Sequence, residues 1–198
     1  MMKQICVFCG SSMGYNSRYR EAAEQLGRLL AESRIGLVYG GAGVGLMKAL
    51  ADSVMQHGGQ VTGVMPVALV EKEVAHPGIP TLHIVADMAE RKSMMVSLSD
   101  GFIAMPGGFG TLDELSEILT FNQLRINESP LGLLNTGGYF EHLLRFFNHG
   151  VAEGFIRGEH RDNLLVSDDS ADLITKMKSW KPVPMGKWIE EIRLESKA

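Results

Sequence analysis

Short apolar runs alternate with helical patterns along almost the whole chain, and this alternation constrains the fold more than any other feature. The runs predict strands, and the segments between them carry apolar residues at helical spacing. The expected strands are 4–9, 35–39, 61–65, 81–85, 101–105, 131–134 and 164–166. The expected helices are 17–33, 46–57, 88–98, 111–124, 139–153 and 171–180.

The strand segments are continuously apolar, not alternating, which is typical of a parallel sheet covered on both faces. Strands that alternate with helices at this spacing indicate βαβ crossovers. The expected fold class is therefore α/β, a Rossmann-like doubly wound parallel sheet with helices on both faces. With 198 residues, of which 45% are hydrophobic, we expect a single domain over 1–180 and a C-terminal tail over 181–198. The irregular segment 66–80 is a candidate flap.

Charge and hydropathy exclude several classes of protein. The net charge is −4, and the 19 Lys and Arg residues are scattered, so we expect no polymeric nucleic acid partner. No window approaches the roughly 18 apolar residues of a membrane-spanning helix, and the first strand is too short for a secretory signal. We expect no membrane partner and a cytoplasmic location.

The cysteines and histidines do not form a recognisable metal motif. Cys6 and Cys9 have C-x-x-C spacing but lie in an apolar strand without a second ligand pair, which favours two structural thiols. The six histidines are dispersed and contain no H-E-x-x-H pattern. We expect no metal site.

Three glycine-rich loops follow predicted strands and precede predicted helices: 10–12, 40–45 and 107–111. Ligands of a doubly wound sheet bind at the carboxyl ends of its strands, and helix N-termini favour anions. The chain has neither a P-loop motif nor a G-x-G-x-x-G after its first strand, which argues against an ATPase or a dehydrogenase. The loops together indicate a ligand that carries phosphate.

Two charged clusters lie at the same expected edge. Thr111 and Glu114 have the spacing of a capping box, which would begin a helix whatever the function. Alternatively, Glu114 lies one helical turn from a bound phosphate and reaches its sugar. Arg91 and Lys92 lie near the start of another helix, where they are either a solvated pair or substrate ligands.

At these residues the chain resembles the LOG (Lonely Guy) family of cytokinin riboside 5′-monophosphate phosphoribohydrolases. The segment 106–114, PGGFGTLDE, matches the family signature P-G-G-x-G-T-x-x-E, and Arg91-Lys92 matches its R-K site. The resemblance extends over nearly the whole chain, including CVFCGSS at 6–12, VYGG at 38–41 and VGLM at 44–47.

The resemblance implies hydrolysis of the N-glycosidic bond of a purine nucleoside 5′-monophosphate, without a metal or organic cofactor. Free base and ribose 5-phosphate would be the products. Arg91 and Glu114 would be the catalytic residues. The implied substrate-binding positions are Ser12, Gly41, Glu73, Lys92, Met94, Gly107, Gly108, Gly110 and Thr111.

The resemblance also implies a homodimer, for which the apolar helix 112–124 is a candidate partner surface. The chain departs from the family pattern at Lys48, where Gly is usual, at Phe121, where Trp is frequent, and in the segment 71–80. AMP and an N6-prenylated adenine nucleotide are both open as the natural substrate.

Two other functions compete with this interpretation. A lysine decarboxylase, a label that some relatives have carried, would need pyridoxal phosphate and a Schiff-base lysine, for which the sequence offers no evident context. A non-catalytic nucleotide-binding carrier or sensor of the same fold would bind the ligand without turnover. The presence of both Arg91 and Glu114 argues against the carrier.

Overall fold

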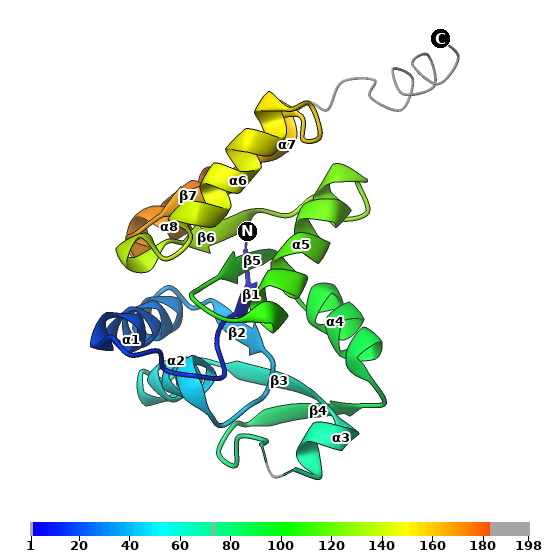
Figure 1. The fold of residues 1–198 in the computed structure, drawn as a ribbon. Helices are drawn as coiled ribbons and strands as arrows, with labels where there is room; N and C mark the ends of the chain where they lie inside the picture. The colour runs from blue at the N-terminus through cyan, green and yellow to red at the C-terminus, as the bar shows by residue number, and fades with distance from the viewer. Residues whose placement is uncertain (1, 73, 183–198) are drawn as a thin grey trace.

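The computed structural model describes residues 2–72 and 74–182. Its centre is one sheet of seven parallel strands in the order β4-β3-β2-β1-β5-β6-β7 (Figure 1). The strands are β1 (Gln4–Phe8), β2 (Gly36–Tyr39), β3 (Val61–Pro66), β4 (Thr81–Val85), β5 (Gly101–Ala104), β6 (Leu131–Leu134) and β7 (Leu164–Ser167). The predicted fold class is confirmed, and each strand ends within two residues of its predicted bounds.

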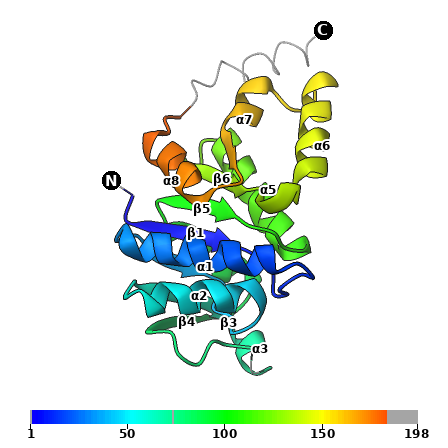
Figure 2. The ribbon, with the colours of Figure 1, turned by 90° about the vertical axis from the view of Figure 1, so that its left-hand side faces the viewer.

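Helices cover both faces of the sheet (Figures 1 and 2). One face carries α1 (Ser17–Glu32), α2 (Gly45–Gln56) and α8 (Ser170–Ser179), and the other carries α4 (Met88–Ser97), α5 (Phe109–Gln123) and α6 (Glu141–Ala152). Successive strand residues pack into different layers, since Val7 joins the core beneath α1 and α2 while Phe8 joins the core beneath α4 and α5. Burial on both faces is the reason that the strands are continuously apolar in sequence.

Three short helical segments were not predicted. The expected flap contains α3 (Val67–Val70), and a further helix, α7 (Gly158–Asp162), precedes β7. A 3-10 turn, η1 (Thr136–Gly138), separates β6 from α6, so α6 begins two residues later than expected. These segments are too short to show apolar periodicity.

Hydrogen bonds join the first glycine-rich loop to residues that flank the other two, at the carboxyl edge of the sheet. The Gly10 amide donates to the Pro106 carbonyl at 3.0 Å, and the Leu46 amide donates to the Gly10 carbonyl at 3.0 Å. β1 lies between β2 and β5 in the sheet, so the chain reverses its direction of winding at this point. Such a switch point is where doubly wound sheets bind ligands.

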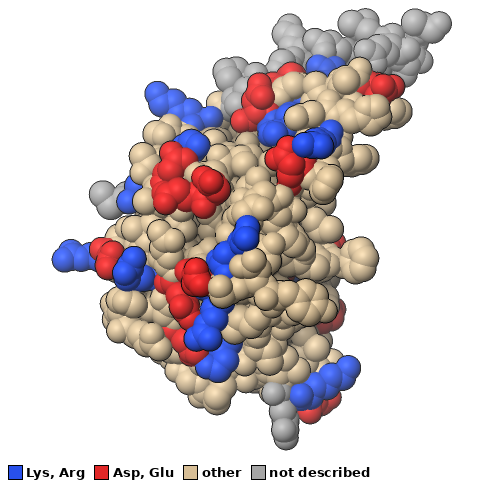
Figure 3. Space-filling model, turned by 60° about the vertical axis from the view of Figure 1, so that its left-hand side comes forward, with Lys and Arg blue, Asp and Glu red and all other residues tan. Residues whose placement is uncertain are grey.

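The surface of the described residues carries charges of both signs. Figure 3 shows cationic and anionic side chains next to one another on one face. None of the helices in residues 2–72 and 74–182 combines the length and hydropathy required to cross a bilayer.

The close contact between the first two loops predicts an unequal response to two alanine substitutions. A Cβ on Gly45, which has φ +56°, would lie 2.2 Å from the Ser11 carbonyl carbon, whereas Gly58, with φ +73°, has open space around it. We expect Gly45→Ala to lower the free energy of unfolding by about 3 kcal/mol and Gly58→Ala by about 1 kcal/mol. Urea denaturation measures both, and equal losses would contradict a steric role for the Gly45 contact.

Candidate active site

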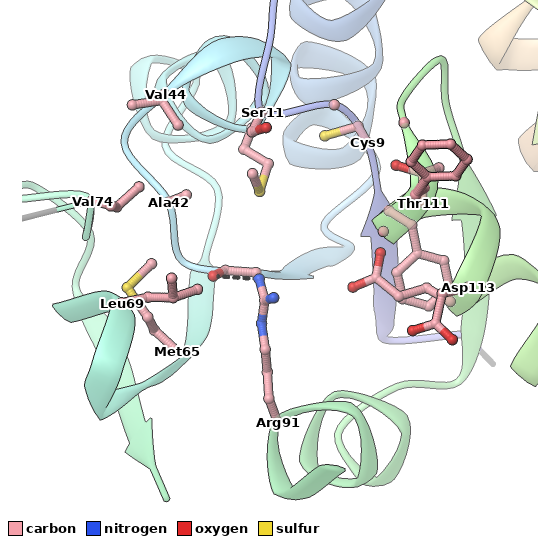
Figure 4. Close-up of a pocket in the computed structure, with 18 of the residues that line it drawn as sticks. Cys9, Ser11, Ala42, Val44, Met65, Leu69, Val74, Arg91, Thr111 and Asp113 are labelled. Carbon is pink, nitrogen blue, oxygen red and sulfur yellow. Dashed lines mark hydrogen bonds between the residues drawn. The ribbon is translucent and has the colours of Figure 1, made fainter. Parts of the chain in front are cut away.

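A cavity of about 410 Å³ opens at the carboxyl ends of β1, β2 and β5. Its walls come from the three glycine-rich loops, from α4 and α5, and from the segment after β3. One side is apolar, with Ala42, Val44, Leu69 and Val74, and the other presents the polar residues Ser11, Thr111 and Asp113 (Figure 4). The cavity therefore has separate surfaces for an apolar group and for a polar group.

Arg91 reaches from α4 into the wall of this cavity and is 8% exposed. Its Nε donates to the Val64 carbonyl at 3.0 Å, and its Nη2 donates to the Gly40 carbonyl at 2.8 Å (Figure 4). These two bonds tie α4 to the ends of β2 and β3. Arg91 is thus a buried, oriented cation and not half of a solvated pair, which corrects one of the two interpretations left open by the sequence.

Gly40 is required by the closeness of Arg91. A Cβ at this position would lie 1.8 Å from Arg91 Nη2 and 3.0 Å from its Cζ. Any side chain here would displace the guanidinium or the strand end. The glycine pair after β2 is therefore explained in part by packing within the protein.

Glu114 projects from the first turns of α5 and lines the same cavity. Burial raises the pKa of this carboxyl to about 7 because desolvation disfavours the charged form, and the nearby positive charge of Arg91 opposes the rise. The pKa of Arg91 is in turn lowered by burial. A carboxyl that titrates near neutral pH beside a fixed cation has the properties of a general base or of an electrostatic stabiliser.

The N-terminus of α5 differs from the predicted capping box. The helix begins at Phe109 with Gly108 as its N-cap, and no side chain caps it, so Thr111 lies inside the first turn. The capping interpretation of Thr111 and Glu114 is therefore wrong, because the glycines allow the helix to begin earlier. The first amides of a helix have no intrahelical acceptor, and here they border the cavity at Gly108, Phe109 and Gly110.

Two glycines of this turn are not explained by packing among the described residues. A Cβ on Gly108 or on Gly110 would meet no atom within 4 Å, in contrast to Gly107, where it would lie 2.1 Å from Thr111 Oγ1. Both open positions line the cavity. They leave room for a group outside the chain to approach the backbone closely.

Lys92 points toward α5 and is held by two carboxylates. Its Nζ lies 3.1 Å from an Asp113 oxygen and 3.2 Å from a Glu117 oxygen. Although burial acts to lower the pKa of Lys92, the hydrogen bonds with Asp113 and Glu117 raise it overall. Lys92 is absent from the cavity lining, while Asp113 is part of it.

The other sequence-predicted site residues lie in different places around the cavity. Thr111 is buried within its lining, and Ser12 and Gly107 line an adjoining cavity of about 310 Å³. Gly41 has φ +75° and lies beside the lining residues of the second loop, whereas Met94 packs into the hydrophobic core under α4 and α5. Glu73 lies outside the described residues.

The segment after α3 pairs with the second glycine loop. Ala75 forms an antiparallel bridge with Ala42, and the Gly43 amide donates to the Val74 carbonyl at 2.8 Å. His76, which is buried, accepts the Gly78 amide on Nδ1 at 3.1 Å, so its Nε2 carries the proton that contacts Asp52 Oδ1 at 3.0 Å. This attachment holds the apolar wall of the cavity in position.

The two cysteines are free and buried, as predicted. Burial raises the pKa of both thiols, which suits structural residues better than nucleophiles. Within residues 2–72 and 74–182, no cluster of three or more His, Cys, Asp or Glu side chains could hold a metal ion.

Sequence reasoning missed part of the cavity. Asp113 and Phe109 were overlooked although they lie within the signature segment, and Met88 and Met65 join Met47 in the lining. Spacing along α5 gives no signal for Asp113, because adjacent residues of a helix do not share a face. The Asp52–His76 contact spans 24 positions and has no local signal.

The fold and the site together define a Rossmann-like α/β protein with an uncapped helix N-terminus and a buried carboxyl at the sheet's switch point. Residues 47–177 match the family model described as "Possible lysine decarboxylase". The chain is 43% identical over 181 residues to the probable cytokinin riboside 5′-monophosphate phosphoribohydrolase LOGL9 of Oryza sativa subsp. japonica, covering 91% of this chain and 80% of the relative. It is 45% identical over 180 residues to the cytokinin riboside 5′-monophosphate phosphoribohydrolase LOG7 of Arabidopsis thaliana, covering 91% and 83%. The chain belongs to this LOG family.

Solved structures share the fold at lower identity. The molybdenum cofactor binding protein from the phototrophic bacterium Rippkaea orientalis superposes with a TM-score of 0.69 and 23% identity, covering 90% of this chain and 97% of that one. The X-ray structure of TM1055 superposes with a TM-score of 0.71 and 20% identity, covering 90% of this chain and 100% of that one. These similarities establish the α/β architecture.

The raised pKa of Glu114 predicts how its removal changes stability with pH. Because the folded protein retains this proton between the ordinary pKa of 4.5 and about 7, its stability relative to the unfolded chain falls as pH rises through that window. We expect Glu114→Gln to raise the free energy of unfolding at pH 8 by on the order of 2 kcal/mol and to leave it nearly unchanged at pH 4. Urea denaturation at both pH values measures this.

The matched control is Asp113→Asn, which changes the adjacent and exposed carboxylate. Loss of an exposed ion pair should alter stability by less than about 1 kcal/mol at pH 8. If Glu114→Gln instead lowered the free energy of unfolding at pH 8, the result would contradict an unfavourable burial of the ionised Glu114 carboxylate.

Proposed function

We propose that this protein is a phosphoribohydrolase. It cleaves the N-glycosidic bond of purine nucleoside 5′-monophosphates, with AMP and N6-modified cytokinin nucleotides as candidate substrates, and releases the free base and ribose 5-phosphate. The observation that carries the proposal is the buried Glu114 beside Arg91, one turn from an uncapped helix N-terminus. The names of the LOG relatives support the same reaction.

The glycine-rich turn suits the 5′-phosphate. The dipole of α5 and its uncapped amides favour an anion, and the open positions at Gly108 and Gly110 admit one close to the backbone. We assign phosphate binding to Gly107, Gly108, Gly110 and Thr111, with Ser12 from the first loop. Phosphate held here would position the sugar C1′ toward Glu114, which favours monophosphates over nucleosides.

Glu114 is the proposed catalytic carboxylate. Cleavage of the glycosidic bond develops positive charge on the ribose ring, which an ionised carboxylate stabilises. The same group orients the attacking water and accepts its proton. A pKa near 7 allows Glu114 to be substantially ionised at neutral pH while remaining basic enough to take that proton.

Arg91 is the second proposed catalytic residue. Its Nε and Nη2 are engaged with backbone carbonyls, so its position is fixed before substrate binds. Its charge favours ionisation of Glu114 and stabilises the negative charge that develops on the departing purine. Because guanidinium does not release a proton at neutral pH, Arg91 is not assigned as a general acid.

The apolar wall suits the purine. Val44, Leu69 and Val74 face the cavity opposite the polar residues, and Met47, Met65 and Met88 supply adaptable surface. Gly41 borders this region through the second loop, whereas Lys92, which pairs with Asp113 and Glu117 of α5, stays a proposed substrate-binding residue on the polar side. Met94, although packed in the core, adjoins Arg91 in α4 and stays a proposed substrate-binding residue, as does Glu73.

The assembly and organisation of the chain are also proposals. We propose one catalytic domain over 1–180, which the single continuous sheet supports, with 181–198 as a tail.

A homodimer is supported by exposed apolar residues near the end of α5, where Leu124 is 47% and Ile126 66% exposed. Two buried free thiols are compatible with a cytoplasmic location.

Hydrolysis of AMP and of N6-isopentenyladenosine monophosphate, assayed without added metal, tests the proposal. The wild-type protein should release free base, and Glu114→Gln should lower kcat by about 10²- to 10⁴-fold. Activity should increase with pH through about 7 as Glu114 ionises. Chromatography of the released base measures both effects. Nucleotide binding without base release by the wild type would instead support the non-catalytic carrier.

Substitution of Gly110 tests the proposed phosphate binding at the glycine-rich turn separately from the stability of the fold. Because Gly110 lies in the first turn of α5 with open space around it, Gly110→Ala should leave the melting temperature unchanged or slightly raised. The added methyl group should raise KM for AMP by at least about tenfold through steric exclusion of the phosphate. An unchanged KM would contradict phosphate binding at this turn.

A further inference from the structure

Tyr139 makes a hydrogen bond that the proposed mechanism does not use. Its hydroxyl donates to the carbonyl oxygen of Gly107 at 2.6 Å, across 32 positions of the chain. Gly107 begins the turn that precedes α5, next to the N-cap Gly108. A distance of 2.6 Å is at the short end for an O–H···O bond, so the contact fixes the carbonyl direction closely.

Several contacts hold Tyr139 itself in place. The Asn135 amide donates to the Ser167 carbonyl at 2.7 Å, and Asn135 Oδ1 accepts the Phe140 amide at 2.7 Å. The Tyr139 ring packs edge-on against Tyr19 and Phe140, with centroid distances of 5.7 and 4.9 Å. Tyr139 is thus anchored to the ends of β6 and β7 and to α1, not to the loop that it contacts.

The bond to Gly107 orients the next peptide unit as a whole. A trans peptide is planar, and its C=O and N–H point in opposite directions, so fixing the Gly107 carbonyl also fixes the Gly108 N–H. Consecutive glycines would otherwise sample many backbone conformations. Ordering them only when an anion binds would cost affinity.

A second bond restrains the residue before this peptide. The Pro106 carbonyl accepts the Gly10 amide at 3.0 Å. The two successive carbonyls at 106 and 107 are therefore held by different parts of the protein, one by the first glycine loop and one by Tyr139. Gly108, which follows them, borders both the 410 Å³ and the 310 Å³ cavities.

We propose that Tyr139 is a positioning residue that preorganises the glycine turn 107–110 for the 5′-phosphate. It acts through the Gly107 carbonyl and does not contact the bond that is cleaved. The ligand class, a nucleoside 5′-monophosphate, rests on the proposed function. Removing the hydroxyl should therefore weaken recognition of the phosphate and leave recognition of the base unaltered.

The test is Tyr139→Phe, which keeps the ring contacts and removes only the hydroxyl. Isothermal titration calorimetry in the Glu114→Gln background, where AMP is expected to survive the titration, should show that the dissociation constants for AMP and for inorganic phosphate rise roughly two- to tenfold, the range for loss of one hydrogen bond. The dissociation constant for adenosine should stay unchanged. In the assay, KM for AMP should rise by a similar factor with kcat altered by less than about twofold.

Tyr15→Phe is the matched control, because Tyr15 is fully exposed and removal of its hydroxyl should change none of these values. Unchanged phosphate affinity in Tyr139→Phe, or equal weakening of AMP and adenosine, would overturn the proposal. The binding measurements test the role of Tyr139 even if the protein does not hydrolyse AMP. A wild-type protein that binds AMP without hydrolysing it refutes the proposed function, while the Tyr139→Phe comparison still decides the role of Tyr139.

Discussion

The buried guanidinium of Arg91 is the interaction on which the site depends. Its bonds to the carbonyls of Gly40 and Val64 join α4 to two adjacent strand ends, and its closeness excludes any side chain at residue 40. A cation with little access to water needs hydrogen-bond acceptors within the protein, and these two carbonyls supply them. Glu114 approaches Arg91 from α5, and the positive charge of Arg91 favours ionisation of its carboxyl. Burial of Arg91 thus links the packing of α4 and α5 to the chemistry of the cavity.

The parallel sheet brings the remaining parts together. Every strand ends at one edge, so the loops 10–12, 40–45 and 107–111 form one surface although they are distant in sequence. The three loops have different roles. The first two pack against each other, whereas the backbone amides and two open glycine positions of the third border the cavity. The glycines of the chain therefore have two physical roles, close packing at Gly40 and Gly45 and access for a ligand at Gly108 and Gly110.

Sequence periodicity was sufficient for the fold because both faces of the central strands β1, β2, β5 and β6 are buried. The glycine-rich loops correctly indicated the edge of the sheet where the cavity lies. Sequence periodicity was insufficient for helix starts and side-chain environments that depend on contacts between distant parts of the chain. The spacing of Thr111 and Glu114 predicted a capping box, but α5 begins at Phe109 because an uncapped glycine turn precedes it. Arg91 and Lys92 are adjacent in sequence, yet one is buried on backbone carbonyls and the other is paired with Asp113 and Glu117. No local pattern distinguishes those two environments.

The central claim is that the turn 107–110 holds the phosphate of a nucleotide whose C1′ faces Glu114. A crystal structure of the Glu114→Gln variant with AMP tests it most directly, because the substitution is expected to preserve the substrate. The account predicts phosphate oxygens within hydrogen-bond distance of the amides at the start of α5 and the C1′–N9 bond beside residue 114. A phosphate bound away from this turn, or a glycosidic bond remote from residue 114, would contradict it.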